Sequence, residues 1–310
     1  MAYNEEANIG HLLESVRQQT AAERIKRIIV VASGCTDRTC EIVGGYADDD
    51  PRITLLIEPS RGGKVLAINA FLAQATEPIL LVSSADIIFE PDTVAHLTAP
   101  FDDDRIGMVG AHPIPMNSRD HFAGFAVNMM WQMHHEVALE QPKMGELIAF
   151  RNVFKGLNPR TMADEVQVEY GIRAVGYEAA YAPNAIVHNR GPETLKEFIA
   201  QRTRCNAYNL QINREQRIPV STMQAGPVLK AMWESVRRQR PRLDWLVAVA
   251  LVELYCRAKG WLQYPQLCSP RHRLWAPQAT TKGLVVAPDS PAHVPVQALP
   301  AELSYHGGPR

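Results

Sequence analysis

The sequence has few cysteines, no long apolar run and almost no net charge. It contains five cysteines, an odd number, and none of them forms a CxxC pair, so neither a structural zinc site nor a disulfide framework is indicated. They are Cys35, Cys40, Cys205, Cys256 and Cys268. A reduced, cytoplasmic setting is the simplest expectation. The N-terminus, MAYNEEANIG, has neither the basic start nor the apolar stretch of a signal peptide.

The longest apolar stretch runs from Leu243 to Leu254 and is interrupted by Asp244 and Glu253. It falls short of the ~20 residues that a membrane-spanning helix needs. We therefore expect no transmembrane helix. Peripheral contact at the inner face of the cytoplasmic membrane is still compatible with this sequence.

The formal net charge of −1 hides a division along the chain. Residues 201–275 contain 13 Lys and Arg against 4 Asp and Glu, a local charge of +9. Residues 1–200 contain 17 bases and 27 acids, a local charge of −10. An acidic first part does not suggest nucleic-acid binding, whereas a basic segment after it can meet phosphates or an anionic membrane surface.

Short apolar, β-branched runs alternate with helical patterns over the first two hundred residues. The expected strands are Ile25–Ala32, Ile53–Ile57, Ile79–Val82 and Ala185–His188. Helices are expected from Asp37, over Lys64–Ala75, from Pro91, over Val166–Ala174 and over Thr194–Leu210. This alternation predicts a Rossmann-like, mostly parallel α/β sheet with helices on both faces. Ligands of such sheets bind beyond the carboxyl ends of the strands, so the loops after Ala32 and Val82 are expected to face one crevice.

The chain opens with a loop, Ala2–Glu6, and a helical pattern, where a sheet of this type would normally have a strand. Either the first strand is missing or truncated in this sequence, or the helix begins the fold. We expect the former. A missing central strand would leave an open sheet edge.

Three local patterns point to chemistry, and each has a structural alternative. Asp86 follows a buried strand and can hold a hard divalent cation through its oxygen atoms, or it can cap the next helix. Lys64, after two glycines, can pair with a phosphate at a helix start or be a solvated terminal lysine. The adjacent acids Asp164 and Glu165 can supply a base for a hydroxyl nucleophile, but acids also favour helix N-termini through the dipole.

A predicted helix further along carries a polar face. Gln201, Arg204 and Cys205 are spaced i, i+3, i+4, so they share that face, and Arg202 adds a cation near it. His188 ends the preceding strand and is either a metal ligand or a neutral hydrogen-bonding residue, which is the commoner role of a lone histidine.

The order of these motifs closely resembles a family 2 glycosyltransferase of the GT-A fold, in the QxxRW-type branch of polysaccharide and lipid-linked sugar synthases. Six motifs occur in register: Ala2-Tyr3-Asn4-Glu5-Glu6, Ser33-Gly34-Cys35-Thr36-Asp37, Gly62-Gly63-Lys64, Ser84-Ala85-Asp86, Asp164-Glu165 and Gln201-Arg202-Thr203-Arg204. The resemblance covers roughly residues 1–210 and implies a catalytic domain over 1–215. A basic helical segment over 216–275 and a Pro-rich, mobile tail over 276–310 are expected to follow.

The resemblance implies roles for individual residues. It places Asp86 at the metal-binding last position of the DxD motif, with His188 as a candidate further ligand of Mn²⁺ or Mg²⁺. Glu165 matches the member of the acidic pair that serves as base, with Asp164 second in line. Gln201, Arg202 and Arg204 match the helix beneath the donor diphosphate and the acceptor. The other residues implied to bind the nucleotide sugar are Ala2, Tyr3, Asn4, Glu5, Glu6, Ser33, Asp37, Lys64 and Ser84.

Three positions depart from the family pattern. Ser33 stands where the family often has an Asp that contacts the nucleotide base, and Ser84 stands where DxD has its first Asp. Both leave the nucleotide open. Cys205 replaces the Trp of QxxRW, so no indole is there to stack on a sugar, which argues against a processive polymerase.

The implied activity is inverting transfer of a sugar from a nucleotide-diphosphate sugar, expected to be a UDP-sugar, to a saccharide or lipid-linked hydroxyl acceptor. No nucleic-acid partner is expected. The alternative, motivated by the three departures and the absent first strand, is a catalytically weak or inactive relative that binds a nucleotide sugar or a partner. A sugar-1-phosphate nucleotidyltransferase would need a GxGTR-like opening loop, which the sequence lacks.

The basic segment has two interpretations. Its arginines can cover a helical face and pair with the acidic first part. Alternatively, Arg237, Arg238, Arg240 and Arg242, beside an apolar stretch with Trp245 and Trp261, suit a helix lying on an anionic membrane.

Overall fold

The computed structural model describes residues 1–159, 164–215, 226, 242–268 and 279–284. The helices are α1 (Ile9–Arg17), α2 (Thr39–Asp49), α3 (Lys64–Leu72), α4 (Thr93–Thr98), α5 (Phe122–Glu140), α6 (Asp164–Ala174), α7 (Leu195–Glu215) and α9 (Leu243–Leu267), with short 3₁₀ turns at Ala22–Arg24, Ala99–Asp102 and Ala279–Thr281. The strands are β1 (Ile28–Ser33), β2 (Ile53–Glu58), β3 (Ile79–Ser83), β4 (Ile87–Phe89), β5 (Ile106–Pro115), β6 (Leu147–Arg151) and β7 (Glu178–Asn189). Arg237, Arg238, Arg240 and the prolines of the tail lie outside the described residues.

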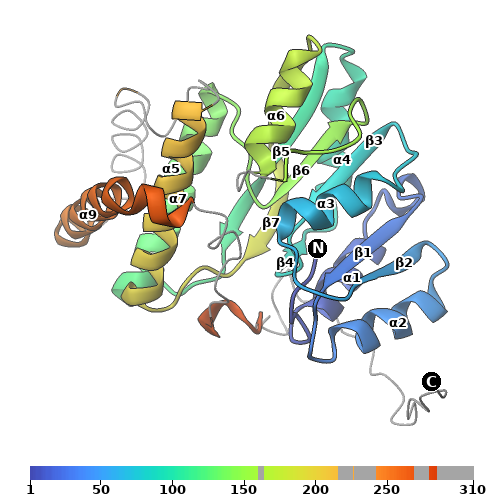
Figure 1. Ribbon diagram of the computed structural model, residues 1–310, viewed down its shortest axis with the longest axis horizontal. Coiled ribbons are helices and arrows are strands. Elements are labelled where there is room, and N and C mark those ends of the chain that lie inside the picture. The colour runs from blue at the N-terminus through green and yellow to red at the C-terminus, as the bar shows by residue number, and fades with distance from the viewer. Residues whose placement is uncertain (160–163, 216–225, 227–241, 269–278, 285–310) are drawn as a thin grey trace.

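The strands form two sheets (Figure 1). Strands β1 and β2 pair in parallel, from Ile28 opposite Ile53 to Ser33 opposite Glu58, as the strand–helix alternation predicts. The second sheet has the order β3-β6-β5-β7-β4, and only β5 and β7 are parallel in it. It is therefore more mixed than the alternation alone indicates, because β6 runs antiparallel to both β3 and β5, and β4 runs antiparallel to β7 at the far edge.

The first two residues join the two sheets. Ala2 pairs in parallel with Ala32, and its N–H donates to the Val31 carbonyl at 2.9 Å. On the other side, the Met1 ammonium donates to the Ser83 carbonyl at 3.2 Å. Among the described residues no named strand lies between β1 and β3.

Helices cover both faces of the sheets, as the sequence predicts. In β6, Leu147 and Ala149 point to one core, which α1, α2 and α4 close, whereas Ile148 and Phe150 point to the other, which α3 and α6 close. This alternation follows from the two-residue period of a strand. The carboxyl ends of β1 and β3 consequently open toward the same region, next to Met1 and Ala2.

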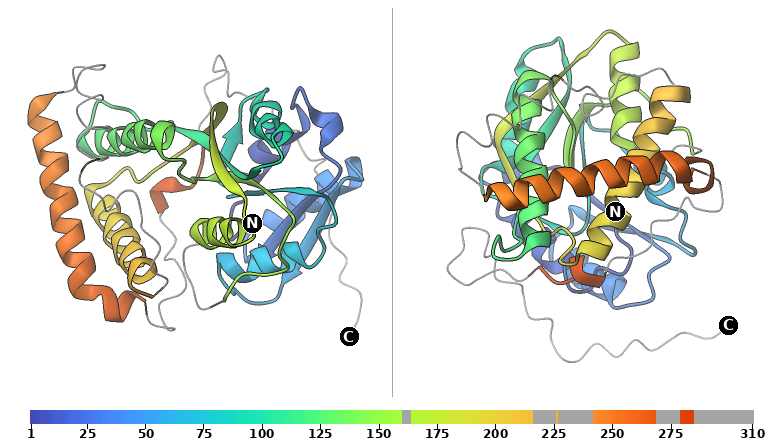
Figure 2. Two further views of the ribbon diagram at one scale, coloured as in Figure 1. Left: turned by 90° about the horizontal axis from the view of Figure 1, so that it is seen from above. Right: turned by 90° about the vertical axis from the view of Figure 1, so that its left-hand side faces the viewer.

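Helices α5, α7 and α9 form a separate layer, and α9 is its outermost member (Figure 2). Val249 and Val252 of α9 pack against a buried cluster that contains Val127 of α5 and Phe198 of α7. Helix α9 approaches α7 closely at Gly260, where an added Cβ would lie 2.8 Å from the Thr203 carbonyl oxygen.

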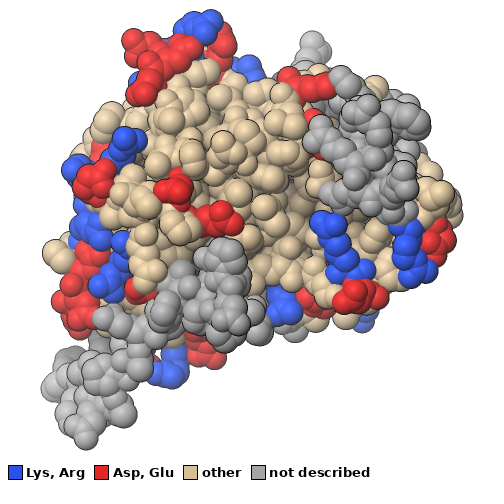
Figure 3. Space-filling model, turned by 180° about the vertical axis from the view of Figure 1, so that it is seen from behind, with Lys and Arg blue, Asp and Glu red and all other residues tan. Residues whose placement is uncertain are grey.

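The charges are interleaved along much of the chain. Arg38 pairs with Glu41, and Arg105 pairs with Asp103, both at 2.8 Å and both exposed. On the face seen in Figure 3, basic and acidic side chains lie side by side toward the rim, around a mostly uncharged centre. The net charge of −10 of residues 1–200 thus does not appear on this face as one broad acidic surface.

Candidate active site

The loop Ala2–Glu6 is fastened to the loop that follows β1. Asn4 has a left-handed backbone, with φ of 52°, and its side-chain oxygen accepts the Thr36 N–H at 2.8 Å. The Glu6 N–H donates to the Asp37 carboxylate at 3.0 Å. These two predicted nucleotide-binding loops therefore form one rigid unit at the end of β1.

Two of the predicted donor-binding residues are used within this unit. The Ser33 hydroxyl accepts the Gly62 N–H at 3.1 Å and thereby ties β1 to the loop before α3. Asp37 accepts the Thr39 N–H at 3.0 Å at the start of α2. Partial burial opposes ionisation of Asp37, but its hydrogen bonds from Thr39 and Glu6 prevail and lower its pKa.

Tyr3 lies beside a cation that the sequence did not single out. The Arg61 guanidinium sits 3.9 Å from the centre of the Tyr3 ring, within the range of a cation–π interaction. Burial lowers the pKa of Arg61, and the nearby positive charge of Arg204 acts in the same direction. Arg204 of α7 therefore lies toward the nucleotide loop, where the sequence predicts a diphosphate.

Lys64 joins both members of the acidic pair. Its Nζ lies 2.7 Å from Asp164 Oδ2 and 2.8 Å from Glu165 Oε1. Lys64 begins α3 and the two acids begin α6, so each group sits at a helix N-terminus and faces the other across the site. The sequence placed Lys64 near the donor and the acids near the acceptor, and the structure brings the three side chains into one cluster.

The two acids differ in ionisation because only one proton is easily lost from such a pair. Burial, together with the Glu165 charge, raises the pKa of Asp164 to about 7. Burial also acts on Glu165, but attraction and hydrogen bonding from Lys64 prevail and lower its pKa. Glu165 is thus the member that stays ionised near neutral pH, the state that a general base requires.

Glu146, just before β6, is a third acid that sequence reasoning missed. Its carboxylate accepts the Ser84 hydroxyl at 3.2 Å and the Asn189 amide at 3.3 Å. Burial, followed by the nearby charge of Asp86, raises the pKa of Glu146 to about 7. No motif marks this residue; only its pairing opposite Ser84 across β3 and β6 brings it to the site.

His188 does not share this group. It lies opposite Ile88 in the β4–β7 pair, whereas Asn189 lies opposite Ile87, on the other face of the strand. The His188 Nε2 is 2.9 Å from the Glu90 carboxylate. The structure therefore brings Asn189, and not His188, next to Glu146.

The helix α7 directs its two arginines differently. Arg202 faces α9, where its Nε and Nη2 each lie 3.0 Å from the Glu253 carboxylate, and this attraction raises the pKa of Arg202 although burial opposes it. Gln201 presents a buried side-chain oxygen that has no hydrogen-bond partner. Burial raises the pKa of the Cys205 thiol, and the nearby charge of Glu165 acts in the same direction. Arg202, predicted to contact the donor, has an ion pair with Glu253 instead.

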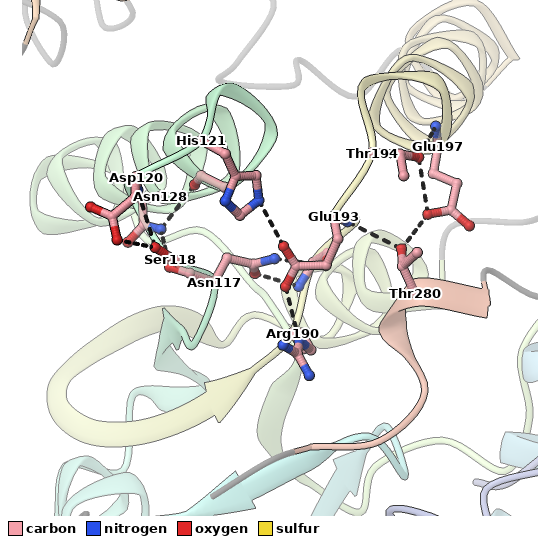
Figure 4. A network of polar contacts seen from close by, with 12 residues as sticks. Asn117, Ser118, Asp120, His121, Asn128, Arg190, Glu193, Thr194, Glu197 and Thr280 are labelled. Carbon is pink, nitrogen blue, oxygen red and sulfur yellow. Dashed lines mark hydrogen bonds and ion pairs between the residues drawn. The ribbon is translucent and has the colours of Figure 1, made fainter. Parts of the chain in front are cut away.

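Residues 279–284 dock onto this region from the C-terminal part of the chain. Figure 4 shows Thr280 between Glu193 and Glu197, next to the start of α7. The Glu193 N–H donates to the Thr280 hydroxyl at 3.1 Å, and the Glu193 carboxylate pairs with Arg190 and His121, each at 2.9 Å. The rest of the predicted mobile tail lies outside the described residues.

The same segment reaches the N-terminal loop. Lys282 pairs with the buried Glu5 carboxylate and donates to the Tyr3 carbonyl at 3.3 Å. Asn8 accepts the N–H groups of Gly283 and Leu284 through its side-chain oxygen, at 3.1 and 2.9 Å. Glu5 is therefore engaged in holding the loop and this segment together.

The oxygen atoms around Asp86 fit a hard divalent cation. In the described part of the chain, no three His, Cys, Asp or Glu side chains are arranged to hold a metal by themselves. Mg²⁺ and Mn²⁺, however, are commonly held by one or two carboxylates, with substrate phosphates as the remaining ligands. Asp86 and Glu146 supply two such carboxylates close to each other.

Comparisons with known proteins agree with the sequence motifs. The profile of the family described as "Glycosyl transferase family 2" matches residues 1–157. An N-acetylglucosaminyltransferase of Rhizobium meliloti is 24% identical over 226 residues, which are 66% of this chain and 53% of that protein. A poly-beta-1,6-N-acetyl-D-glucosamine synthase of Staphylococcus epidermidis is 22% identical over 65% of this chain and 51% of its own. The chain thus spans about half the length of these curated relatives.

A solved structure shares the fold. The mannosyltransferase PcManGT from Pyrobaculum calidifontis, in complex with GDP-Man and Mn²⁺, superposes with a TM-score of 0.60 over 86% of this chain and 85% of its own, at 20% identity. The GT-A fold expected from the sequence is confirmed by this likeness. Since the family profile covers half of the residues, the chain belongs to glycosyl transferase family 2.

Proposed function

We propose that this protein transfers a sugar from a nucleotide-diphosphate sugar to a hydroxyl acceptor with inversion at the anomeric carbon. The observation that carries the proposal is the cluster of Lys64, Asp164 and Glu165, in which Lys64 lowers the pKa of the Glu165 carboxylate beside Asp164, whose pKa burial raises to about 7. A sugar-transfer site needs such a base near the acceptor hydroxyl.

In the proposed reaction, Glu165 accepts the proton of the acceptor hydroxyl as its oxygen attacks the anomeric carbon. The bond from that carbon to the diphosphate oxygen breaks, and the nucleoside diphosphate leaves with the electron pair. When bound beside Asp86, Mn²⁺ or Mg²⁺ supplies positive charge that offsets the charge developing on the diphosphate. Arg204 adds positive charge from α7.

Loss of the base tests this mechanism. We expect Glu165→Gln to reduce transfer at least about a thousandfold, within the range seen for lost general bases, while donor binding is largely kept. Glu169→Gln is a matched control because Glu169 is on the same helix and pairs with Arg173 at 2.8 Å. Near-normal turnover of Glu165→Gln would remove this residue from the base role.

The donor is the next question. The names of two curated relatives point to N-acetylglucosamine, and the PcManGT structure holds GDP-Man. We propose UDP-N-acetylglucosamine as the first donor to test, with GDP-mannose as the second. A thermal-shift panel of UDP-, GDP- and dTDP-sugars with Mn²⁺ identifies the nucleotide by the largest rise in melting temperature.

A nucleotide-sugar-binding protein without transfer activity is the competing function. It is favoured by the serine at position 84 and by the use of Ser33 to hold Gly62. Release of nucleoside diphosphate from the donor in the presence of Mn²⁺ or Mg²⁺ separates the two functions, since only an active transferase breaks that bond.

We further propose peripheral membrane contact through α9, on the way to a lipid-linked or envelope saccharide acceptor. Large apolar side chains are exposed along its outer face at helical spacing: Leu243, Val247, Leu251, Leu254, Tyr255, Trp261 and Leu262.

Arg242, exposed at the helix start, follows the arginine-rich sequence at 237–240. Arg202 and Arg257 both form ion pairs with Glu253 of the same segment. An anionic lipid surface would accept both the apolar face and the flanking cations. No helix among the described residues is both long and apolar enough to cross a bilayer.

A further inference from the structure

Asn189 has a buried oxygen with nothing to bind. Its side chain is at the end of β7 and the residue is 5% exposed. The side-chain nitrogen donates to the Glu146 carboxylate at 3.3 Å, whereas the Oδ1 atom has no hydrogen-bond partner among the described residues. A buried polar atom of this kind costs stability unless a ligand satisfies it.

A carboxylate accepts a hydrogen bond from this amide and lies beside the loop that carries Asp86. Asp86 follows Ser84 by two residues, and the Ser84 hydroxyl lies 3.2 Å from the Glu146 carboxylate. Within the part of the chain that the structure describes, the Glu146 carboxylate accepts hydrogen bonds from the Ser84 hydroxyl and from the Asn189 amide. Two acids beside an unsatisfied carbonyl oxygen form an all-oxygen group, which is the ligand type that Mg²⁺ and Mn²⁺ prefer.

We propose that Glu146 and the Oδ1 atom of Asn189 complete, with Asp86, the protein ligands of the divalent cation. This inference rests on the proposed function and adds two residues to it. Glu146 thereby supplies the carboxylate that Ser84 lacks, because the Ser84 hydroxyl donates to Glu146 and holds that carboxylate next to the position of the absent acid. Oxygen atoms of the donor diphosphate fill the remaining positions.

The position of Asn189 on β7 also separates this proposal from one that uses His188. Adjacent residues of a strand point to opposite faces, so only one of the two can face Glu146. His188 faces Ile88 and Glu90 and forms a 2.9 Å contact with the latter. The cation site therefore has oxygen ligands from this strand and no imidazole.

Binding of Mn²⁺ tests the proposal without an activity assay. It is measured through the electron paramagnetic resonance signal of free Mn²⁺. The full chain is titrated with Mn²⁺ alone and in the presence of UDP or GDP. We expect Glu146→Gln and Asn189→Leu each to weaken Mn²⁺ binding at least about tenfold. Glu90→Gln is the matched control, since it removes a carboxylate at the end of β4 on the other face, and we expect its affinity to stay within about twofold of the original.

Folding is checked by the melting temperature of each variant. Glu146→Gln keeps the side-chain shape and removes a buried charge, so it is expected to fold; Asn189→Asp is the second variant, which keeps an oxygen ligand and is expected to retain binding. If Glu146→Gln binds Mn²⁺ as the original chain does, the inference is wrong while the proposed function stands. If the original chain binds no Mn²⁺ with either nucleotide, both the inference and metal assistance are wrong.

Discussion

The Nζ atom of Lys64 lies 2.8 Å from the Oε1 atom of Glu165, although the two residues are 101 positions apart in the sequence. The contact brings the start of α3 to the start of α6 across the candidate site. A cation at this place sets the ionisation of the base that we propose for sugar transfer. Four measurable consequences follow from this and from other contacts of the fold.

Replacing Lys64 by Met should move the acid limb of the activity profile to higher pH. In the native protein Lys64 lowers the pKa of Glu165, so the base is lost only as the pH falls below the ordinary glutamate range. Without the ammonium, burial raises the pKa of Glu165. We then expect the acid limb of the kcat/KM profile to lie at least about one pH unit higher. Lys155→Met is the control for loss of a lysine. A limb at unchanged pH would contradict the role of Lys64.

Asp164 should make folding stability decline with rising pH. Its pKa is about 7 in the folded protein and near 4 in the unfolded chain, so the folded state holds this proton longer. The associated stability is fully present below about pH 4 and is lost as the pH rises through 7. Between pH 5 and pH 8, we expect the free energy of unfolding to fall by about 1–3 kcal/mol less in Asp164→Asn than in the native protein, as measured by urea unfolding. Parallel pH curves for the two proteins would rule this out.

Gly260 should be intolerant of a side chain. A Cβ there would lie 2.8 Å from the Thr203 carbonyl oxygen, so Gly260→Ala pushes α9 away from α7. We expect destabilisation of about 1–3 kcal/mol, measured by urea unfolding. Gly44→Ala in α2, where nothing lies within 4 Å of the added atom, should instead stabilise by about 0.5–1 kcal/mol. Equal effects at both glycines would show that α9 does not pack as described.

The exposed face of α9 should bind anionic membranes. We expect the protein to float with liposomes that contain phosphatidylglycerol and much less with phosphatidylcholine alone. Replacing both Leu251 and Leu254 by Glu should abolish flotation, because it places charge in the middle of the apolar face. Val175→Glu is the control, since Val175 is equally exposed elsewhere, at 57%. Absence of binding to either lipid mixture would refute the membrane proposal.

The sequence predicts the strands and helices near the nucleotide loops well. β2 begins at Ile53 and α3 begins at Lys64, as expected, because each follows a turn and carries an unbroken apolar pattern. It predicts nothing for β5 and α5, since their apolar residues lie on both sides and give no clear period. β7 is longer than expected, from Glu178, because its first half pairs with β5 and needs no continuous apolar run.

Some of the site residues named by motif come together because two helix starts face each other. Lys64 at the start of α3 meets Asp164 and Glu165 at the start of α6 in this way. Glu146 and Asn189 carry no motif, and their relation to Asp86 depends on strand pairing between distant segments, which no local pattern encodes. Arg202 is turned toward Glu253 because residues two apart on a helix point to different sides.

The contact between Asn8 and the segment at 283–284 closes a loop of almost the whole chain, since Leu284 and Asn8 are 276 positions apart. We expect a contact that closes so long a loop to form late in folding. By then the sheets have formed and have reduced the chain entropy that remains to be lost. We expect this contact between Asn8 and residues 283–284 to be among the last to form and the first to open. Because it holds Asn8 and Glu5, any reagent that frees residues 279–284 loosens the Tyr3 loop before it disturbs the core.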